Sequence, residues 1–181
     1  VRERAALAET AEETGVEAGE EADGPRHPIT GDLPPTPIQR WFYQQDPADP
    51  HHFNQAMLVE VREALDPQRL ERALAAVLAH HDALRLAVRH DGSGWTQWIA
   101  PPDGKADLAV HDLSRLPAAE RRDAMLEVAA ARQSGFDLAR GPLVNATLFH
   151  LDPDRPARLL IVAHHLVVDF FSWRILLEDL Q

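Results

Sequence analysis

An apolar segment of strand type, Arg158 to His165, stands near the C-terminal end of the sequence and closes with two adjacent histidines, His164 and His165. Asp169 follows four residues after His165, and a helical pattern begins directly after it. Because side chains alternate across a strand, we expect one histidine in the core and the other at the end of the strand. This stretch predicts a strand that carries a candidate active site at its C-terminal end.

Helical patterns with recognisable starts surround this strand. Thr36 and Asp66 each precede a proline, which suits the N-cap and first position of a helix, and Ser114 is the expected N-cap of a third helix with Gly135 as its stop. Asp169 is the expected cap of a last helix. The helices are expected from residue 37, from residue 67, over 117–133 and over 170–180.

Strand patterns separate these helices, and turn residues mark two hairpins, one at 91–94 and one at 152–156. The strands are expected over 51–61, 84–90, 95–99, 108–113, 143–151 and 158–165. The alternation of helices and strands predicts an α/β fold with helices packed on a mixed sheet.

Composition limits the classes of protein. The chain has 181 residues and no cysteine, which excludes disulfides, thiolate metal sites and a cysteine nucleophile and is typical of a cytoplasmic protein. The net charge of −11 argues against binding to nucleic acid, whose affinity depends on neutralised phosphates. No apolar run approaches the roughly 20 residues that cross a membrane, so we expect no membrane partner.

The charge is concentrated at one end of the chain. Residues 1–24 hold eight acidic and two basic residues, with several glycines and prolines between 15 and 28. Such a segment has little to bury, so residues 1–30 are expected to be an acidic flexible linker and 31–181 a folded unit. The first eight residues are also compatible with the end of a carrier protein's last helix.

The histidine pair and Asp169 admit several chemistries. A neutral histidine at the strand end can act as a general base near pH 7, whereas Asp169 can orient a histidine, pair with an arginine or cap the helix. We expect no metal site, because adjacent histidines on a strand diverge and no third ligand stands at helical spacing. The pairs at 51–52 and 80–81 are assigned to loops or the core. A triad with Ser172 lacks the surrounding nucleophile-elbow motif.

These residues resemble a known family. The pattern His-His-x3-Asp followed by Ser-Trp-Arg is similar to the signature of the condensation-domain superfamily of nonribosomal peptide synthetases. The residues of this and the other matching segments are most similar to the epimerization subtype. Four segments carry the resemblance in the expected order: 33–42, 51–56, 80–85 and 164–176.

The resemblance implies a fold and roles for residues. It implies the N-terminal one of two chloramphenicol-acetyltransferase-like lobes, with a cleft between the lobes for the phosphopantetheine arm of a carrier protein and no cofactor bound directly. His165 becomes the acid/base residue, His164 a structural residue, and Asp169 a structural residue paired with Arg85. Inversion at Cα needs proton donors on two faces, and the family's second donor is a glutamate of the other lobe.

Two departures from the family pattern bear on activity. The chain ends at Gln181, so the resemblance implies that the second lobe lies outside it, and Phe170 replaces the signature glycine. Phe170 either fills the substrate channel beside Ser172 or turns into apolar space left by the missing lobe. We therefore expect this chain alone to be inactive.

Three functions stay open on the sequence alone. The first is the N-terminal half of an epimerization domain that acts on a carrier-bound aminoacyl or peptidyl thioester. The second is a degenerate half-domain that serves as a structural or docking module, and the third is an amide-forming condensation lobe. The expected partners are an upstream carrier protein and neighbouring synthetase domains. Self-association is also expected, through exposed apolar residues such as Phe171, Trp173, Ile175 or Leu176.

Overall fold

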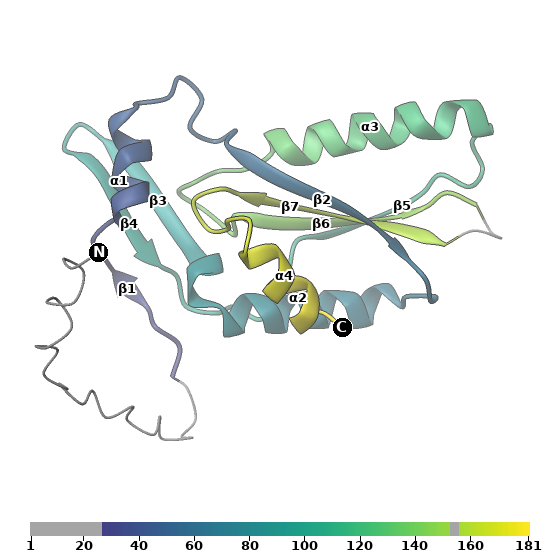
Figure 1. Cartoon of the computed structure of the whole chain (residues 1–181), viewed down its shortest axis with the longest axis horizontal. Coiled ribbons are helices and arrows are strands. Elements are labelled where there is room, and N and C mark those ends of the chain that lie inside the picture. Colours follow the sequence, from purple (N-terminus) through teal and green to yellow (C-terminus); the bar gives the residue numbers. More distant parts are fainter. Residues whose placement is uncertain (1–26, 153–155) are drawn as a thin grey trace, which may run out of the picture.

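A four-stranded mixed sheet is the centre of the fold in the computed structural model, which describes residues 27–152 and 156–181 (Figure 1). Its strands follow the order β2 (Asn54–Val61), β7 (Ala157–His164), β6 (Val144–His150) and β5 (Leu108–Asp112). β5 runs parallel to β6, and the other two pairs are antiparallel, so the predicted mixed sheet is confirmed. Residues 1–26 of the expected linker lie outside the described residues.

The two central strands explain why their sequences are nearly continuous in apolar residues. β6 and β7 each have a neighbour on both edges and are buried along most of their length. A strand covered on both faces has no solvent side for polar residues, so the usual alternation is lost. The fully buried apolar side chains of this region include Leu143, Leu148, Phe149, Val162 and Ala163.

Helices cover both faces of this sheet (Figure 1). α2 (Pro67–His80) and α4 (Ser172–Asp179) lie on one face, where Leu74, Leu176 and Ile161 of β7 meet around the same small apolar cavity. α3 (Ala118–Ser134) lies on the other face, where Arg132 Nε donates to Asn145 Oδ1 of β6 at 3.2 Å. The strand end that carries the two histidines therefore lies between helical layers.

A smaller antiparallel sheet and α1 (Pro37–Gln44) stand beside the larger sheet (Figure 1). This sheet consists of β1 (Gly31–Asp32), β4 (Gly94–Ile99) and β3 (Leu86–Asp91), in that order, and it includes the predicted hairpin at 91–94.

A polar chain of contacts links the smaller sheet to the region after β7. Burial raises the pKa of the Tyr43 phenol, whose O–H donates to Gln97 Oε1 at 2.5 Å. Gln97 Nε2 donates to Gln39 Oε1 at 3.1 Å, and Gln39 Nε2 donates to the Leu166 carbonyl at 3.3 Å. These bonds connect α1 to the turn that contains His165.

Several predicted boundaries agree with the structure and others do not. Thr36 and Asp66 cap α1 and α2 as predicted, and Gly135 ends α3. The prediction of Ser114 as N-cap is wrong, because its hydroxyl donates to Asp112 instead and α3 begins at residue 118. The strand expected from residue 84 starts at 86, because residues 82–85 form a 3₁₀ turn that places Arg85.

None of the helices in the described segments is both long enough and apolar enough to cross a membrane.

Candidate functional site

His164, the last residue of β7, is fully buried. Its Nε2–H donates to the Pro50 carbonyl at 2.9 Å, and its Nδ1 accepts the Leu166 N–H at 3.2 Å. A carbonyl can only accept and an amide N–H can only donate, so these bonds define the neutral tautomer with the proton on Nε2. Burial lowers the pKa of His164 to about 4, because the charged ring would lose its hydration. His164 is therefore a neutral residue of the core.

His165 lies one residue beyond β7 and is exposed. Its backbone N–H donates to the Phe53 carbonyl at 2.7 Å, which extends the β2–β7 ladder by one step. Its ring stacks on the Phe53 ring with centroids 5.1 Å apart, and Phe53 stacks in turn on Phe42, also at 5.1 Å. Two adjacent histidines thus differ in burial, because β7 ends between them, and the stacked phenylalanine rings fix the plane of the exposed His165 ring.

Both ring nitrogens of His165 have protein partners. Nδ1 lies 2.8 Å from the Val168 carbonyl oxygen, and Nε2 lies 3.0 Å from the side-chain nitrogen of Gln55. The Trp173 indole N–H donates to the other side of the same amide, Gln55 Oε1, at 2.7 Å. Sequence reasoning missed Gln55 and Trp173 as site residues. Both stand inside segments that carry the resemblance, but their contact joins residues 118 positions apart.

Asp169 directs the chain into α4. Its Oδ1 accepts the Ser172 N–H at 2.8 Å and the Ser172 Oγ–H at 2.7 Å. These hydrogen bonds from Ser172 lower the pKa of the Asp169 carboxyl, because they favour its charged form. α4 begins at Ser172 and not at the predicted Phe170, because Phe170 and Phe171 form the turn that Asp169 closes.

The expected ion pair between Asp169 and Arg85 is absent from the described residues. Arg85 is buried, and its Nη2 pairs with Asp82 Oδ1. Its remaining N–H groups donate to four backbone carbonyls, those of Ile29, Leu78, Ala79 and Ala100. These five acceptors match the five donors of a guanidinium, so none is left for Asp169. Arg85 instead joins the end of α2 to the smaller sheet.

A pocket of about 420 Å³ opens in front of His165. Its wall on the α1 side is largely apolar and includes Ile38, Trp41 and Phe53. The other wall is the segment from His165 to Asp169, and Ser172 completes it. The lining thus combines an apolar surface with one exposed imidazole and one carboxylate, so an apolar binding surface lies beside a group that can exchange a proton.

Phe170 lies outside the lining of this pocket. The side chains of Phe170 and Phe171 are 82% and 77% exposed, and their rings contact each other edge to face at 5.9 Å. Ile175 is exposed as expected. Trp173 and Leu176, also expected on an exposed surface, are buried instead, because the helix turns them toward the sheet.

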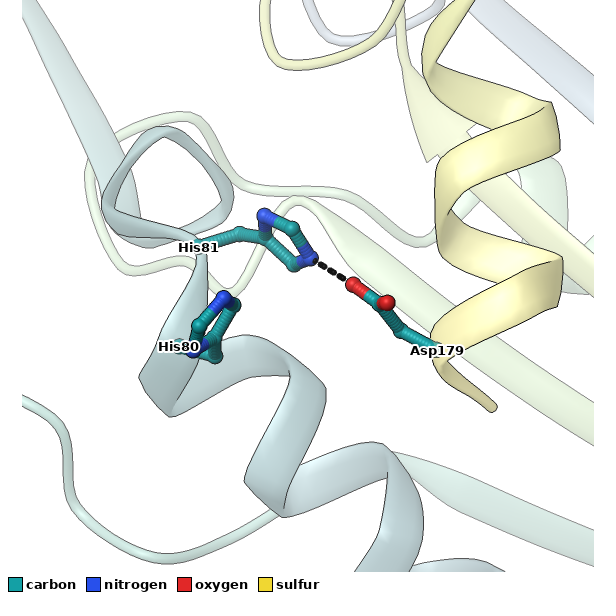
Figure 2. A group of neighbouring side chains, drawn as sticks. All are labelled: His80, His81 and Asp179. Atoms are coloured by element: carbon teal, nitrogen blue, oxygen red, sulfur yellow. Dashed lines mark hydrogen bonds and ion pairs between the residues drawn. The ribbon is translucent and has the colours of Figure 1, made fainter. Parts of the chain in front are cut away.

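A second group of titratable side chains joins the C-terminal ends of α2 and α4 (Figure 2). Figure 2 shows His81 directed at Asp179, with His80 beside them, and His81 Nε2 lies 2.6 Å from Asp179 Oδ2. Two ligands of tetrahedral zinc lie roughly 3.4 Å apart, given metal–ligand bonds of about 2.0–2.1 Å. The spacing is therefore that of a hydrogen bond, and we interpret the pair as a link between the helices. Sequence reasoning did not predict this link.

Comparison with known proteins agrees with this arrangement. The family model described as "Condensation domain" matches residues 29–181. The chain belongs to the condensation-domain family. Among curated relatives, this condensation-family chain is 47% identical over 153 residues to a linear gramicidin synthase subunit of Brevibacillus parabrevis, and 37% identical over 165 residues to surfactin synthase subunit 2 of Bacillus subtilis (strain 168). The matches cover 84% and 91% of this chain but only 3% and 4% of those synthases, which are nonribosomal peptide synthetase subunits.

Solved structures of the family have the same fold. The epimerization domain from the third module of tyrocidine synthetase B superposes with a TM-score of 0.77 and 34% identity, covering 84% of this chain and 33% of that one. The starter condensation domain of rhizomide synthetase gives a TM-score of 0.68 at 22% identity, covering 83% of this chain and 36% of its own, and supports the fold alone. The condensation-family chain thus corresponds to about a third of each solved domain.

Proposed function

We propose that residues 31–181 are the N-terminal lobe of an epimerization-type domain of a nonribosomal peptide synthetase, and that residues 1–30 link it to a carrier protein. The observation that carries this proposal is the position of His165, an exposed imidazole on the wall of an apolar pocket, beside the buried and neutral His164. The 34% identity to a solved epimerization domain favours this subtype.

In the proposed reaction His165 is the acid/base residue. The substrate is an aminoacyl or peptidyl thioester on the phosphopantetheine arm of a carrier protein. The neutral imidazole takes the α-proton, so that the Cα–H bond breaks, an N–H bond forms, and the electron pair moves to the thioester oxygen as an enolate. Return of a proton to the opposite face gives the inverted centre.

We infer that the second proton donor comes from another part of the full synthetase. Among the described residues that line the pocket, Asp169 is the one other titratable group, and its carboxylate is engaged by Ser172. It is therefore better suited to hold the turn than to donate a proton. For the same reason we expect no epimerization from this chain alone. Ser172, which lines the pocket, is the proposed contact for the substrate arm, whereas Phe170, expected in the channel, lies outside the lining.

Deuterium incorporation at Cα of a carrier-loaded aminoacyl thioester in D₂O tests the proposal. A full-length domain that contains this lobe should exchange the α-proton, and His165→Ala should abolish the exchange. The isolated chain should show none. Exchange by the full-length domain that persists in His165→Ala would overturn the assignment of His165, whereas His165-dependent exchange by this chain alone would overturn its inactivity.

A second candidate is a structural or docking module within a synthetase. The exposed Phe170 and Phe171 favour it, because adjacent exposed aromatic residues are common at protein contacts. A full-length domain that neither exchanges the α-proton nor forms an amide, and still binds a neighbouring synthetase domain through these residues, would support the docking module.

An amide-forming condensation lobe is the third candidate, since His165 can equally deprotonate an attacking amine. Peptide bond formation between two carrier-loaded substrates by the full-length domain, without α-proton exchange, would support it.

A further inference from the structure

We propose that Gln55, itself oriented by Trp173, is a positioning residue that keeps His165 in the tautomer with a proton on Nδ1 and an unprotonated Nε2. The inference rests on the proposed function only in its consequence, namely that Nε2 is the atom that accepts the substrate proton. Gln55 is a positioning residue because it acts through the imidazole.

The first constraint on the tautomer is the turn after β7. His165 Nδ1 lies 2.8 Å from the carbonyl oxygen of Val168, three residues on. A carbonyl oxygen has no proton to give, so a hydrogen bond at this distance requires the proton on Nδ1. In the neutral ring, Nε2 then carries the lone pair.

The second constraint comes from a different part of the chain and gives the same result. An indole N–H can only donate, so Trp173 determines that the oxygen of the Gln55 amide faces it, at 2.7 Å. The amide nitrogen must then face His165 Nε2, 3.0 Å away. Because that nitrogen is a donor, Nε2 must accept. Two independent contacts thus select one tautomer.

The alternation of side chains along β2 and β7 brings Gln55, His165 and Trp173 together on one face of the sheet. Gln55 pairs with Ala163 on β7, so its side chain lies on the sheet face that α4 covers. Trp173, in the first turn of α4, is only 7% exposed and is therefore held in place. Asn54, the neighbouring residue along β2, lies on the opposite face and donates to the Gln133 carbonyl of α3 at 2.6 Å.

The neighbouring His164 shows that the tautomer of each histidine is set by its own hydrogen-bond partners. His164 has its proton on Nε2, because that atom faces the Pro50 carbonyl while Nδ1 accepts a backbone N–H. Adjacent residues with the same side chain therefore have opposite tautomers. The consequence for chemistry is that the proton taken from Cα binds at Nε2, and the Gln55 amide must turn aside as it does so.

Long-range ¹H–¹⁵N correlation spectroscopy of the imidazole rings in the full chain tests the proposal, at a pH at which both rings are neutral. His165→Asn assigns the signals. The wild-type protein should show a protonated Nδ1 and an unprotonated Nε2 for His165, and the reverse for His164. A protonated Nε2 on neutral His165 in the wild-type protein would overturn the proposal without any variant.

Two variants test the roles of Gln55 and Trp173 in setting the tautomer of His165. Gln55→Glu has almost the same shape and still accepts from Trp173, but it cannot donate to Nε2. We expect loss of the unprotonated Nε2 signal. The matched control Gln44→Glu makes the same charge change at an exposed position of α1 and should leave the His165 spectrum unchanged. Trp173→Phe removes the indole N–H, so the amide is free to flip and the signal should split or broaden.

An unchanged His165 spectrum in Gln55→Glu would overturn the role of Gln55 as the residue that positions His165. Should that variant not fold, an unchanged spectrum in Trp173→Phe would overturn the orienting contact. This readout does not depend on turnover, so its failure is distinct from failure of the proposed function, which the α-proton exchange assay measures.

Discussion

Adjacent histidines at the end of β7 differ in the solvent around them, and this difference decides what each can do. His164 is fully buried with both ring nitrogens bonded to backbone groups, whereas His165 is exposed on the wall of the pocket. A buried imidazole avoids charge because the interior hydrates it poorly. Of these two histidines, only His165 is therefore placed to exchange a proton with a molecule in the pocket.

The buried histidine makes stability depend on pH. The folded-state pKa of His164, about 4, lies below the unfolded value of 6.5, so its stabilisation is complete above pH 6.5 and is lost as the pH falls toward 4. At pH 5 the loss is about 2 kcal/mol. His164→Gln removes this titration, so urea denaturation at pH 7.5 and 5.0 should show a smaller decrease than in wild type.

The matched control is His27→Gln, at an exposed position. It should retain the full wild-type decrease. An equal decrease in the His164 variant and in this control would show that other groups cause the pH dependence.

Arg85 is a residue whose loss should cost much stability. Its buried guanidinium satisfies four carbonyls and Asp82, and Arg85→Met leaves these acceptors without donors. We expect a loss of about 3–5 kcal/mol in the free energy of unfolding, measured by urea denaturation. Arg62→Met, at an exposed position, should change it by less than about 0.5 kcal/mol. Similar effects of the two changes would contradict the structural part given to Arg85.

At the scale of elements, the position of α4 decides whether the site is complete. This helix carries Trp173, which orients Gln55. Hydrogen bonds hold both ends of the helix. Asp169 bonds to Ser172 at its start, and Asp179 bonds to His81 of the α2 end. A helix of only eight residues has little stability alone, so these ties and its apolar face hold it in place.

The link between His81 and Asp179 should be a modest hydrogen bond and not a metal site. A double-mutant cycle with His81→Gln and Asp179→Asn should give a coupling of about 0.2–1 kcal/mol, because both side chains are partly exposed. One equivalent of Zn²⁺ should leave the Tm unchanged. A rise of several degrees that disappears in Asp179→Asn would show instead that the cluster binds metal.

At the scale of the whole molecule, the exposed aromatic residues beside the site are the unusual feature. Phe170, Phe171 and Ile175 are exposed close together in the chain, and Phe170 directly follows Asp169 of the pocket lining, so these residues form an exposed edge beside the site. The chain corresponds to about a third of the solved domains it resembles, so this edge is where we propose that another part of a synthetase packs.

We expect this edge to cause self-association of the chain in the absence of such a partner. The weight-average mass from light scattering should rise with protein concentration, and Phe170→Ser combined with Phe171→Ser should reduce the rise. Leu126→Ser, which removes an exposed apolar residue of α3 on the far side of the sheet, is the control and should not. A constant monomer mass for the wild-type chain would count against the prediction.

The order of elements could be predicted from the sequence, because local signals specify it. Thr36 and Asp66 began their helices as predicted, and the apolar runs of β6 and β7 indicated central strands. Motif spacing predicted the family, which the family comparison confirmed. These properties depend on backbone preferences and hydrophobic periodicity over a few neighbouring residues, which a sequence displays directly.

The partners of individual polar side chains were decided by the tertiary structure alone. Sequence reasoning paired Asp169 with Arg85, but the 3₁₀ turn before β3 brings Arg85 against Asp82 and four carbonyls. It overlooked Gln55 and Trp173, which meet across 118 residues. A hydrogen bond requires atoms about 3 Å apart in a definite orientation, and only the packed sheet and helices determine which atoms satisfy that. The sequence thus located the histidine pair at the end of β7, and the packing determined which histidine is exposed and what holds its ring.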